Sequence, residues 1–195
     1  MIGCYKLPGE WRKANRWTRF CVEWSKRVNR SRRSEMAASD SLLVDEFWMR
    51  QALGLAEEAS RWGEVPVGAL VVDGDRLISQ AFNLRETLKD PTAHAERVAL
   101  TLAGKALGSW RLDGLTLYAT LEPCLMCAGA IVQSRIRRVV YGAEDPKAGA
   151  CRSLYRATND RRLNYQSETV GGVLAEESSE ILKRFFQAKR LKHPK

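Results

Sequence analysis

The chain has 195 residues, of which 45% are hydrophobic and 28% charged, as is typical of a soluble globular protein. This length is enough for one domain with a full core and short for two. No apolar run approaches the roughly 20 residues that cross a bilayer, and the N-terminus lacks the apolar stretch of a secretory signal. The five cysteines are an odd number, which argues against a secreted disulfide framework and favours a reducing cytoplasm.

The net charge of +9 is concentrated at the N-terminus. Residues 1–35 carry ten Lys or Arg and three Glu, a charge of +7, which leaves +2 for the rest of the chain. Basic and aromatic side chains are interleaved in this segment, and such a mixture can bind nucleic acid. Three interpretations stay open: an extension produced by an over-long reading frame, which we favour, an RNA-binding arm, and a transit peptide, which the glutamates disfavour.

Hydrophobic periodicity becomes regular from residue 45 and predicts an amphipathic helix that ends at Gly63, since glycine is a common C-cap. The apolar, β-branched run over 65–72 predicts a buried strand. Asp73-Gly74-Asp75 then predicts a hairpin turn into a returning strand over 76–83.

The second half of the chain alternates helices with strands after a polar loop that ends at residue 92. We expect a helix over 94–106, a strand over 115–120, a helix over 124–134, a strand over 138–141, a short strand over 169–173 and a helix over 176–191. Residues 143–166 are polar and give no clear pattern. Strand–helix–strand repeats imply a parallel portion of sheet, here preceded by an antiparallel hairpin, and therefore an α/β fold.

Two cysteines three residues apart, Cys124 and Cys127, open the predicted helix over 124–134. On a first helical turn both sulfurs lie on one face and can reach one metal ion. The positive end of the helix dipole favours the thiolates that zinc needs. Alone, a C-x-x-C pair also fits a redox dithiol, half of a structural zinc site, or packing.

The remaining cysteines and the histidines narrow these interpretations. Cys4, Cys21 and Cys151 are isolated, so a second C-x-x-C pair is lacking. His193 lies in the C-terminal tail, which leaves His94 as the imidazole ligand. Three protein ligands leave the fourth position of a tetrahedral zinc open, as in catalytic sites.

Glu96 follows His94 by two residues, at the start of the predicted helix over 94–106. There it can take a proton from a water whose pKa zinc lowers to about 7, and pass it to a ring nitrogen and a leaving amine. By itself, Glu96 would be read as an exposed first-turn carboxylate favoured by the helix dipole. Together, however, H-x-E and P-C-x-x-C form the signature of zinc deaminases, which hydrolyse the exocyclic amine of a nucleobase.

From Phe47 to about Arg190 the chain resembles bacterial tRNA-specific adenosine deaminases, within the cytidine/deoxycytidylate deaminase-like zinc deaminases. The matching stretches are EVPVGA (64–69), DPTAHAE (90–96), TLEPCLMCAGA (120–130) and SRIRRVVYGAEDPKAGA (134–150). The resemblance implies a cytidine-deaminase-like fold with three α/β/α layers and a mixed sheet of about five strands. Residues 45–195 would form the zinc-dependent deaminase domain, and residues 1–44 a basic N-terminal extension, disordered or an artefact of the reading frame.

The activity that the resemblance implies is hydrolytic deamination of adenosine to inosine at the wobble position of a tRNA anticodon. A cytoplasmic homodimer would act on the tRNA anticodon stem-loop with one Zn²⁺ per subunit. By the resemblance, His94, Cys124 and Cys127 hold zinc, and Glu96 is the catalytic proton shuttle.

The resemblance also assigns four residues to the substrate. Asn83 aligns with the family's asparagine that hydrogen-bonds the everted base. Asp145 and Lys147 lie in the loop that touches anticodon nucleotides. Phe186, the partner of a core Phe185, would line the pocket of the flanking base. Without the resemblance, Asn83 also fits a strand-end turn residue, and Asp145 and Lys147 fit ordinary loop residues.

Three alternative functions stay open at this point. A deaminase of free guanine, cytidine or a pterin-like base would share the four central residues, although TLEPCLMCAGA and the basic aromatic C-terminal helix favour RNA. A non-catalytic RNA-binding or partner subunit is disfavoured, because inactive members of such folds typically lose the carboxylate that Glu96 provides. A zinc-stabilised structural module would have no open coordination position.

Overall fold

The computed structural model describes residues 41–192, while residues 1–40 and 193–195 lie outside the described part. Most of the predicted extension over residues 1–44, and with it the choice among its three interpretations, falls outside this range. His193 falls outside it as well. Among the described helices, none has the length and apolar composition needed to span a membrane.

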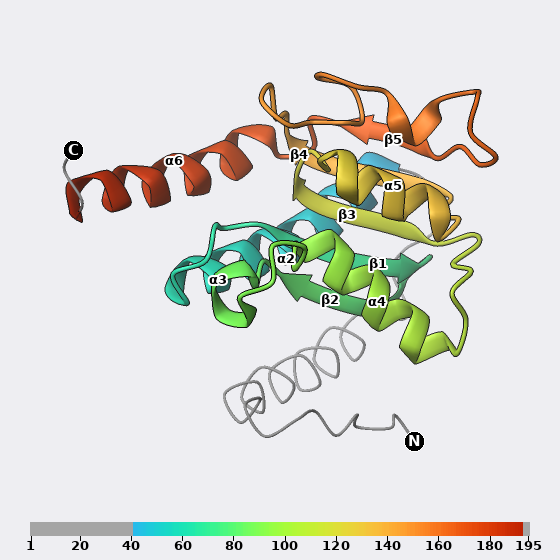
Figure 1. Ribbon diagram of the computed structural model, residues 1–195, viewed down its shortest axis with the longest axis horizontal. Helices are drawn as coiled ribbons and strands as arrows, with labels where there is room; N and C mark the ends of the chain where they lie inside the picture. The colour runs from blue at the N-terminus through green and yellow to red at the C-terminus, as the bar shows by residue number, and fades with distance from the viewer. Residues whose placement is uncertain (1–40, 193–195) are drawn as a thin grey trace. The chain divides into compact units, whose positions relative to one another are not determined.

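A five-stranded mixed sheet in the order β2-β1-β3-β4-β5 forms the centre of the fold (Figure 1). β1 (Gly68–Asp73) pairs antiparallel with both β2 (Arg76–Phe82) and β3 (Thr116–Leu121). β4 (Arg138–Ala143) pairs parallel with β3, and β5 (Glu168–Gly171) pairs parallel with β4. The predicted antiparallel hairpin followed by a parallel portion is therefore confirmed.

Helices cover both faces of the sheet and complete the expected three layers (Figure 1). α4 (Ala95–Leu107) and α5 (Leu125–Gln133) lie side by side on one face. α2 (Ser41–Arg61) and α6 (Ala175–Lys192) pack on the other. The far end of α6, drawn in red, runs outward past the sheet.

The contact between α2 and β1 explains one glycine of the EVPVGA stretch. α2 buries Trp48, Met49 and Leu55 against the sheet, and burial of each such side chain contributes about 1.5–3 kcal/mol. A Cβ at Gly68 would overlap the carbonyl oxygen of Ala52. Only glycine therefore lets α2 approach β1 this closely.

The structure differs from the sequence-based expectations in three places. α2 begins at Ser41 rather than near residue 45. A short helix, α3 (Arg85–Leu88), replaces part of the predicted polar loop, and a 3₁₀ turn, η2 (Ala157–Asn159), lies in the segment that gave no pattern. α3 forms because its first backbone N–H groups have a buried acceptor, the Glu64 carboxylate.

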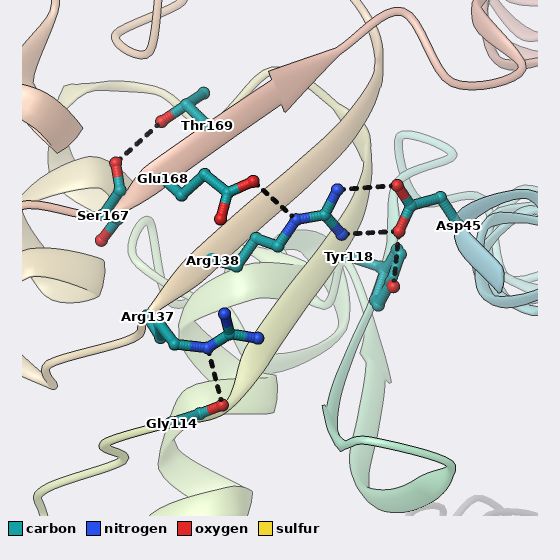
Figure 2. Close-up of polar contacts among 8 residues, drawn as sticks. All are labelled: Asp45, Gly114, Tyr118, Arg137, Arg138, Ser167, Glu168 and Thr169. Carbon is teal, nitrogen blue, oxygen red and sulfur yellow. Dashed lines mark hydrogen bonds and ion pairs between the residues drawn. The ribbon is translucent and has the colours of Figure 1, made fainter. Parts of the chain in front are cut away.

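A polar cluster around the buried Asp45 ties α2 to three strands (Figure 2). The Asp45 carboxylate accepts hydrogen bonds from both terminal nitrogens of Arg138, at 2.6 and 2.8 Å, and from the Tyr118 hydroxyl at 2.8 Å. Nε of Arg138 also donates to Glu168 at 3.2 Å. Burial, together with the bond to Asp45, raises the pKa of Tyr118. Because Arg138 is the first residue of β4, this cluster lies at the end of the strand opposite to the cavity described next.

Candidate active site

A cavity opens where β2, β3 and β4 end. β2 and β3 run in the same direction, since both are antiparallel to β1, and β4 is parallel to β3. The loops that follow the three strands therefore meet at one edge of the sheet. They bring Asn83, Glu122, Cys124 and Asp145 to the cavity wall. This is the edge at which α/β proteins commonly bind ligands.

The three predicted zinc ligands come together at this edge. His94 and Cys124 are the N-cap residues of α4 and α5, and Cys127 lies in the first turn of α5. Nδ1 of His94 lies 3.6 Å from Sγ of Cys124 and 3.6 Å from Sγ of Cys127. All three candidate ligand atoms lie within 4.8 Å of one another.

These separations fit a tetrahedral zinc ion. With Zn–S bonds of about 2.3 Å and a Zn–N bond of about 2.1 Å, tetrahedral angles place nitrogen and sulfur about 3.6 Å apart. The donor types, one imidazole and two sulfurs, are those that zinc prefers, and three protein ligands leave one position for water or substrate. The cluster can therefore hold a zinc ion of the catalytic kind.

The electrostatics of the cysteine pair suit a cation. A hydrogen bond with Cys127, aided by His94, lowers the pKa of Cys124 to about 3, so this sulfur is a thiolate at neutral pH. The same hydrogen bond raises the pKa of Cys127, because burial and the neighbouring thiolate disfavour a second negative charge. A bound cation would displace that remaining proton.

Glu96 lies in the first turn of α4 and lines the cavity, with only 4% of its surface exposed. It is therefore not the exposed first-turn carboxylate that the sequence also allowed. Burial raises the pKa of Glu96. A carboxyl group with a raised pKa is suited both to accept and to return a proton in the neutral range.

Asn83 lines the cavity directly after β2 and is buried. Its Nδ2 donates a hydrogen bond of 3.1 Å to the carboxylate of Glu64, which is itself fully buried. In the sequence, Glu64 stood out only as the first residue of the matching stretch EVPVGA. Arg85, the first residue of α3, also lines the cavity and was missed. The only sequence feature that could have indicated Arg85 is its position, as a basic residue two places after Asn83.

The loop after β4 carries two more of the predicted residues. Asp145 lines the cavity, and its Oδ1 accepts the backbone N–H groups of Lys147 and Ala148 at 2.9 and 3.2 Å. Lys147 is exposed and is not among the residues that form the wall. Asp145 thus shapes the turn that presents Lys147 to solvent.

Glu122, the residue after β3, holds this loop in place. Its carboxylate is buried and accepts the backbone N–H groups of Asp145, Cys151, Arg152 and Ser153, as well as the Ser153 hydroxyl. Burial opposes ionisation of this group, but the hydrogen bonds outweigh burial and lower its pKa. The sequence gave Glu122 no role of its own.

Phe186 is 44% exposed on α6, whereas its neighbour Phe185 is 8% exposed. The two rings meet edge to face, with centroids 5.4 Å apart. Phe185 is thus the core member of the pair, as the sequence predicted. Phe186 is not among the wall residues of the cavity, so its contact with a flanking base stays a prediction.

The fold and the sequence together define the class of this protein. Residues 44–190 match the family model of the MafB19-like deaminases. A solved structure described as a study of A-to-I editing by tRNA:A34 deaminases at the wobble position of transfer RNA is 44% identical, with a TM-score of 0.68. The match covers 70% of this chain and 99% of that chain. The protein is therefore a deaminase with the cytidine-deaminase-like fold.

Curated relatives narrow the class further. The chain is 49% identical over 148 residues to the tRNA-specific adenosine deaminase of Bacillus subtilis, which covers 76% of this chain and 92% of the relative. It is 50% identical over 147 residues to the tRNA-specific adenosine deaminase of Haemophilus influenzae. That match covers 75% of this chain and 85% of the relative. The chain belongs to the family of tRNA-specific adenosine deaminases. A guanine deaminase from Nitrosomonas europaea, 22% identical with a TM-score of 0.66 over 95% of this chain and 94% of that one, shares the fold.

Proposed function

We propose that this protein converts adenosine to inosine at the wobble position of a tRNA anticodon by hydrolytic deamination. Membership of the family supports the substrate class. The observation that carries the chemistry is the composition of one cavity wall. It joins His94 and Cys124 of the ligand cluster to the buried carboxylate of Glu96 and the amide of Asn83.

His94, Cys124 and Cys127 would hold one Zn²⁺ per subunit, as their donor types and 3.6 Å separations allow. When bound, zinc supplies a Lewis acid that makes water nucleophilic near neutral pH. All three residues stand at helix starts, where the backbone fixes their positions. Of the three, His94 and Cys124 line the cavity.

Glu96 would move the protons of the reaction. Its carboxylate takes one proton from the attacking water and delivers it to N1 of the adenine, then takes the second proton from the new hydroxyl at C6 and gives it to the leaving amine. Water adds at C6, the C6–N6 bond breaks, ammonia departs and the ring keeps an oxygen as inosine. Burial raises the pKa of the Glu96 carboxyl, which makes its carboxylate a stronger base toward the protons of the reaction.

The remaining predicted residues would bind the RNA. The target base must leave its stack, because its C6 is out of reach otherwise, and anticodon loops offer bases that can be everted. Asn83 would hydrogen-bond the everted base, and Asp145 and Phe186 would contact the neighbouring nucleotides. Lys147, exposed beside the cavity mouth, would meet a phosphate. We further propose a homodimer that works in the cytoplasm.

Ammonia release from matched RNAs tests this function. One anticodon stem-loop carries adenosine at the wobble position, and the other carries guanosine there. We expect one ammonia per RNA from the first stem-loop and none from the second. Release from the guanosine RNA alone would assign a different base to the cavity.

A further inference from the structure

Glu64 is a charged side chain with no exposed surface, in the segment between α2 and β1. Its Oε2 accepts hydrogen bonds from Nδ2 of Asn83 and from the backbone N–H of Glu86, both at 3.1 Å. Its Oε1 accepts the backbone N–H of Thr87 at 2.6 Å. Burying a carboxylate is costly unless donors replace its water. Here three N–H groups do so, and one of them belongs to a residue of the cavity wall.

The bond to Glu64 decides which end of the Asn83 amide faces the cavity. A side-chain amide has one donor end and one acceptor end, and rotation by half a turn exchanges them. A carboxylate that receives N–H donors acts only as an acceptor, so Asn83 must turn Nδ2 toward Glu64. Within the part of the chain that the structure describes, Oδ1 of Asn83 makes no hydrogen bond. Because Asn83 lines the cavity, Oδ1 is the end available to a ligand.

The same carboxylate also holds the first turn of α3. The N–H groups of Glu86 and Thr87 point at Glu64, and Arg85, one residue earlier, lines the cavity. One buried group thus fixes both the amide and the backbone that follows it. The backbone after Asn83 therefore holds the Glu64 carboxylate in place, and the bond from Nδ2 to this fixed group keeps the amide from turning over.

We infer that Glu64 is a positioning residue, which locks the Asn83 amide so that Oδ1 presents a hydrogen-bond acceptor to the substrate base. The inference rests on the proposed deaminase function. An acceptor at this place favours a base edge that donates, and a freely rotating amide would lose that preference. Glu64 itself does not line the cavity, so its effect reaches the base through Asn83.

The variant Glu64→Gln tests the orientation of the Asn83 amide while the side chain at position 64 keeps its size. An amide at position 64 accepts at one end only: with its oxygen on the N–H of Thr87, its amino group faces Asn83, which then turns Oδ1 toward it. The cavity would receive the donor end of Asn83. We expect kcat/KM on the anticodon stem-loop to fall roughly tenfold to a hundredfold, as for a lost hydrogen bond to substrate. Zinc content and circular dichroism should stay those of the wild type.

The double variant Glu64→Gln with Asn83→Asp should restore activity. The introduced aspartate accepts from the introduced glutamine with one oxygen and offers the other to the cavity. In both Glu64→Gln and the double variant, the N–H of Glu86 loses its acceptor. The effect of that loss on activity therefore cancels when the two variants are compared. We expect the double variant to exceed Glu64→Gln by roughly threefold to tenfold, which is half the lost factor on a logarithmic scale. Asn83→Asp alone sets two carboxylates face to face and should stay poor.

Two outcomes of the kinetics would overturn the inference. A double variant no more active than Glu64→Gln, with full zinc and wild-type circular dichroism, would show that orientation is not what Glu64 provides. Equal activity of Asn83→Asp alone and the double variant would assign the effect to charge. Inactivity of the wild type on the stem-loop would instead contradict the proposed function.

Hydrogen exchange of the Asn83 side-chain amide gives a readout that needs no turnover. In wild-type protein, Nδ2 bonded to the buried Glu64 should exchange slowly. In Glu64→Gln the same group turns to the cavity and should exchange at least tenfold faster, in keeping with the loss of one buried hydrogen bond. Equal exchange rates in the two proteins would overturn the inference whatever the activity.

Discussion

His94 and Cys124 stand 30 residues apart in the sequence, and each is the N-cap of its helix, with Nδ1 and Sγ 3.6 Å apart. Both residues have the extended backbone conformation that is usual at an N-cap. The cap position brings both side chains to the edge of the sheet where the strands end, so that their candidate ligand atoms face one another. The fold itself therefore places these two candidate ligands.

Removing one ligand should remove the metal. We expect wild-type protein to carry about one zinc per chain, and Cys127→Ala to bind zinc at least tenfold more weakly, because two ligands hold zinc poorly. Deamination should fall with the zinc content. The matched control is Cys151→Ala, a buried cysteine outside the ligand cluster, which should keep its zinc. Elemental analysis after dialysis gives the ratio, and full zinc in Cys127→Ala would refute the ligand assignment.

Glu96→Gln should separate chemistry from metal binding. Glutamine keeps the size of the side chain but cannot shuttle a proton, so the single-turnover rate should fall by about 10²–10⁴-fold. Zinc content and thermal stability should be retained, because Glu96 is a neighbour of the ligands and not one of them. Rapid-quench measurement of inosine gives the rate. A zinc-loaded Glu96→Gln protein within threefold of wild type would exclude Glu96 as the shuttle.

The ligand cluster could be predicted because its signal is local. H-x-E and P-C-x-x-C are short motifs, and each stands at the start of a predicted helix. The N-terminal ends of α4 and α5 meet because β2, β3 and β4 all run toward the same edge of the sheet. The order of strands and helices followed from periodicity in the same way, and element ends agree with the predictions to within a few residues.

The hydrogen bonds that hold the site in place could not be predicted, because buried carboxylates make them to residues far away in the sequence. Glu64 contacts a residue 19 positions away, and Glu122 reaches residues 29 to 31 positions away. Glutamate is normally an exposed residue, so neither position shows in a hydrophobic pattern. α3 was missed for the same reason, since its first turn depends on Glu64 rather than on its own periodicity.

Breaking the cluster around Asp45 should destabilise the fold without changing the chemistry. Asp45→Ala leaves the Arg138 guanidinium without its two bonds and the Tyr118 hydroxyl without an acceptor (Figure 2). We expect a loss of about 3 kcal/mol in the free energy of unfolding, measured by urea titration. Asp113→Ala, which breaks the exposed pair with Arg111, should leave the free energy of unfolding nearly unchanged. Equal effects of the two variants would contradict the structural role of Asp45.

Tyr118 should make stability sensitive to alkaline pH. Its pKa is raised in the folded state, so its contribution is complete below the unfolded value of about 10 and is lost as pH rises through the folded pKa. Tyr118→Phe should be less stable than wild type at pH 7 by about 1 kcal/mol, since one hydrogen bond is lost. That difference should shrink as pH rises above about 10, because ionisation of unfolded Tyr118 then weakens only the wild type. A difference that grows with pH would contradict the raised pKa.

Position-resolved inosine in a full-length tRNA tests the activity and the substrate together. Zinc-loaded protein is incubated with a tRNA that carries adenosine at the wobble position, and separately with free adenosine, guanine and cytidine. Inosine pairs with cytosine, so reverse transcription and sequencing locate it. We predict inosine at the wobble position alone and no ammonia from the free compounds. Ammonia from a free base with unchanged tRNA would contradict the RNA substrate, and silence of every reaction at full zinc would contradict catalysis itself.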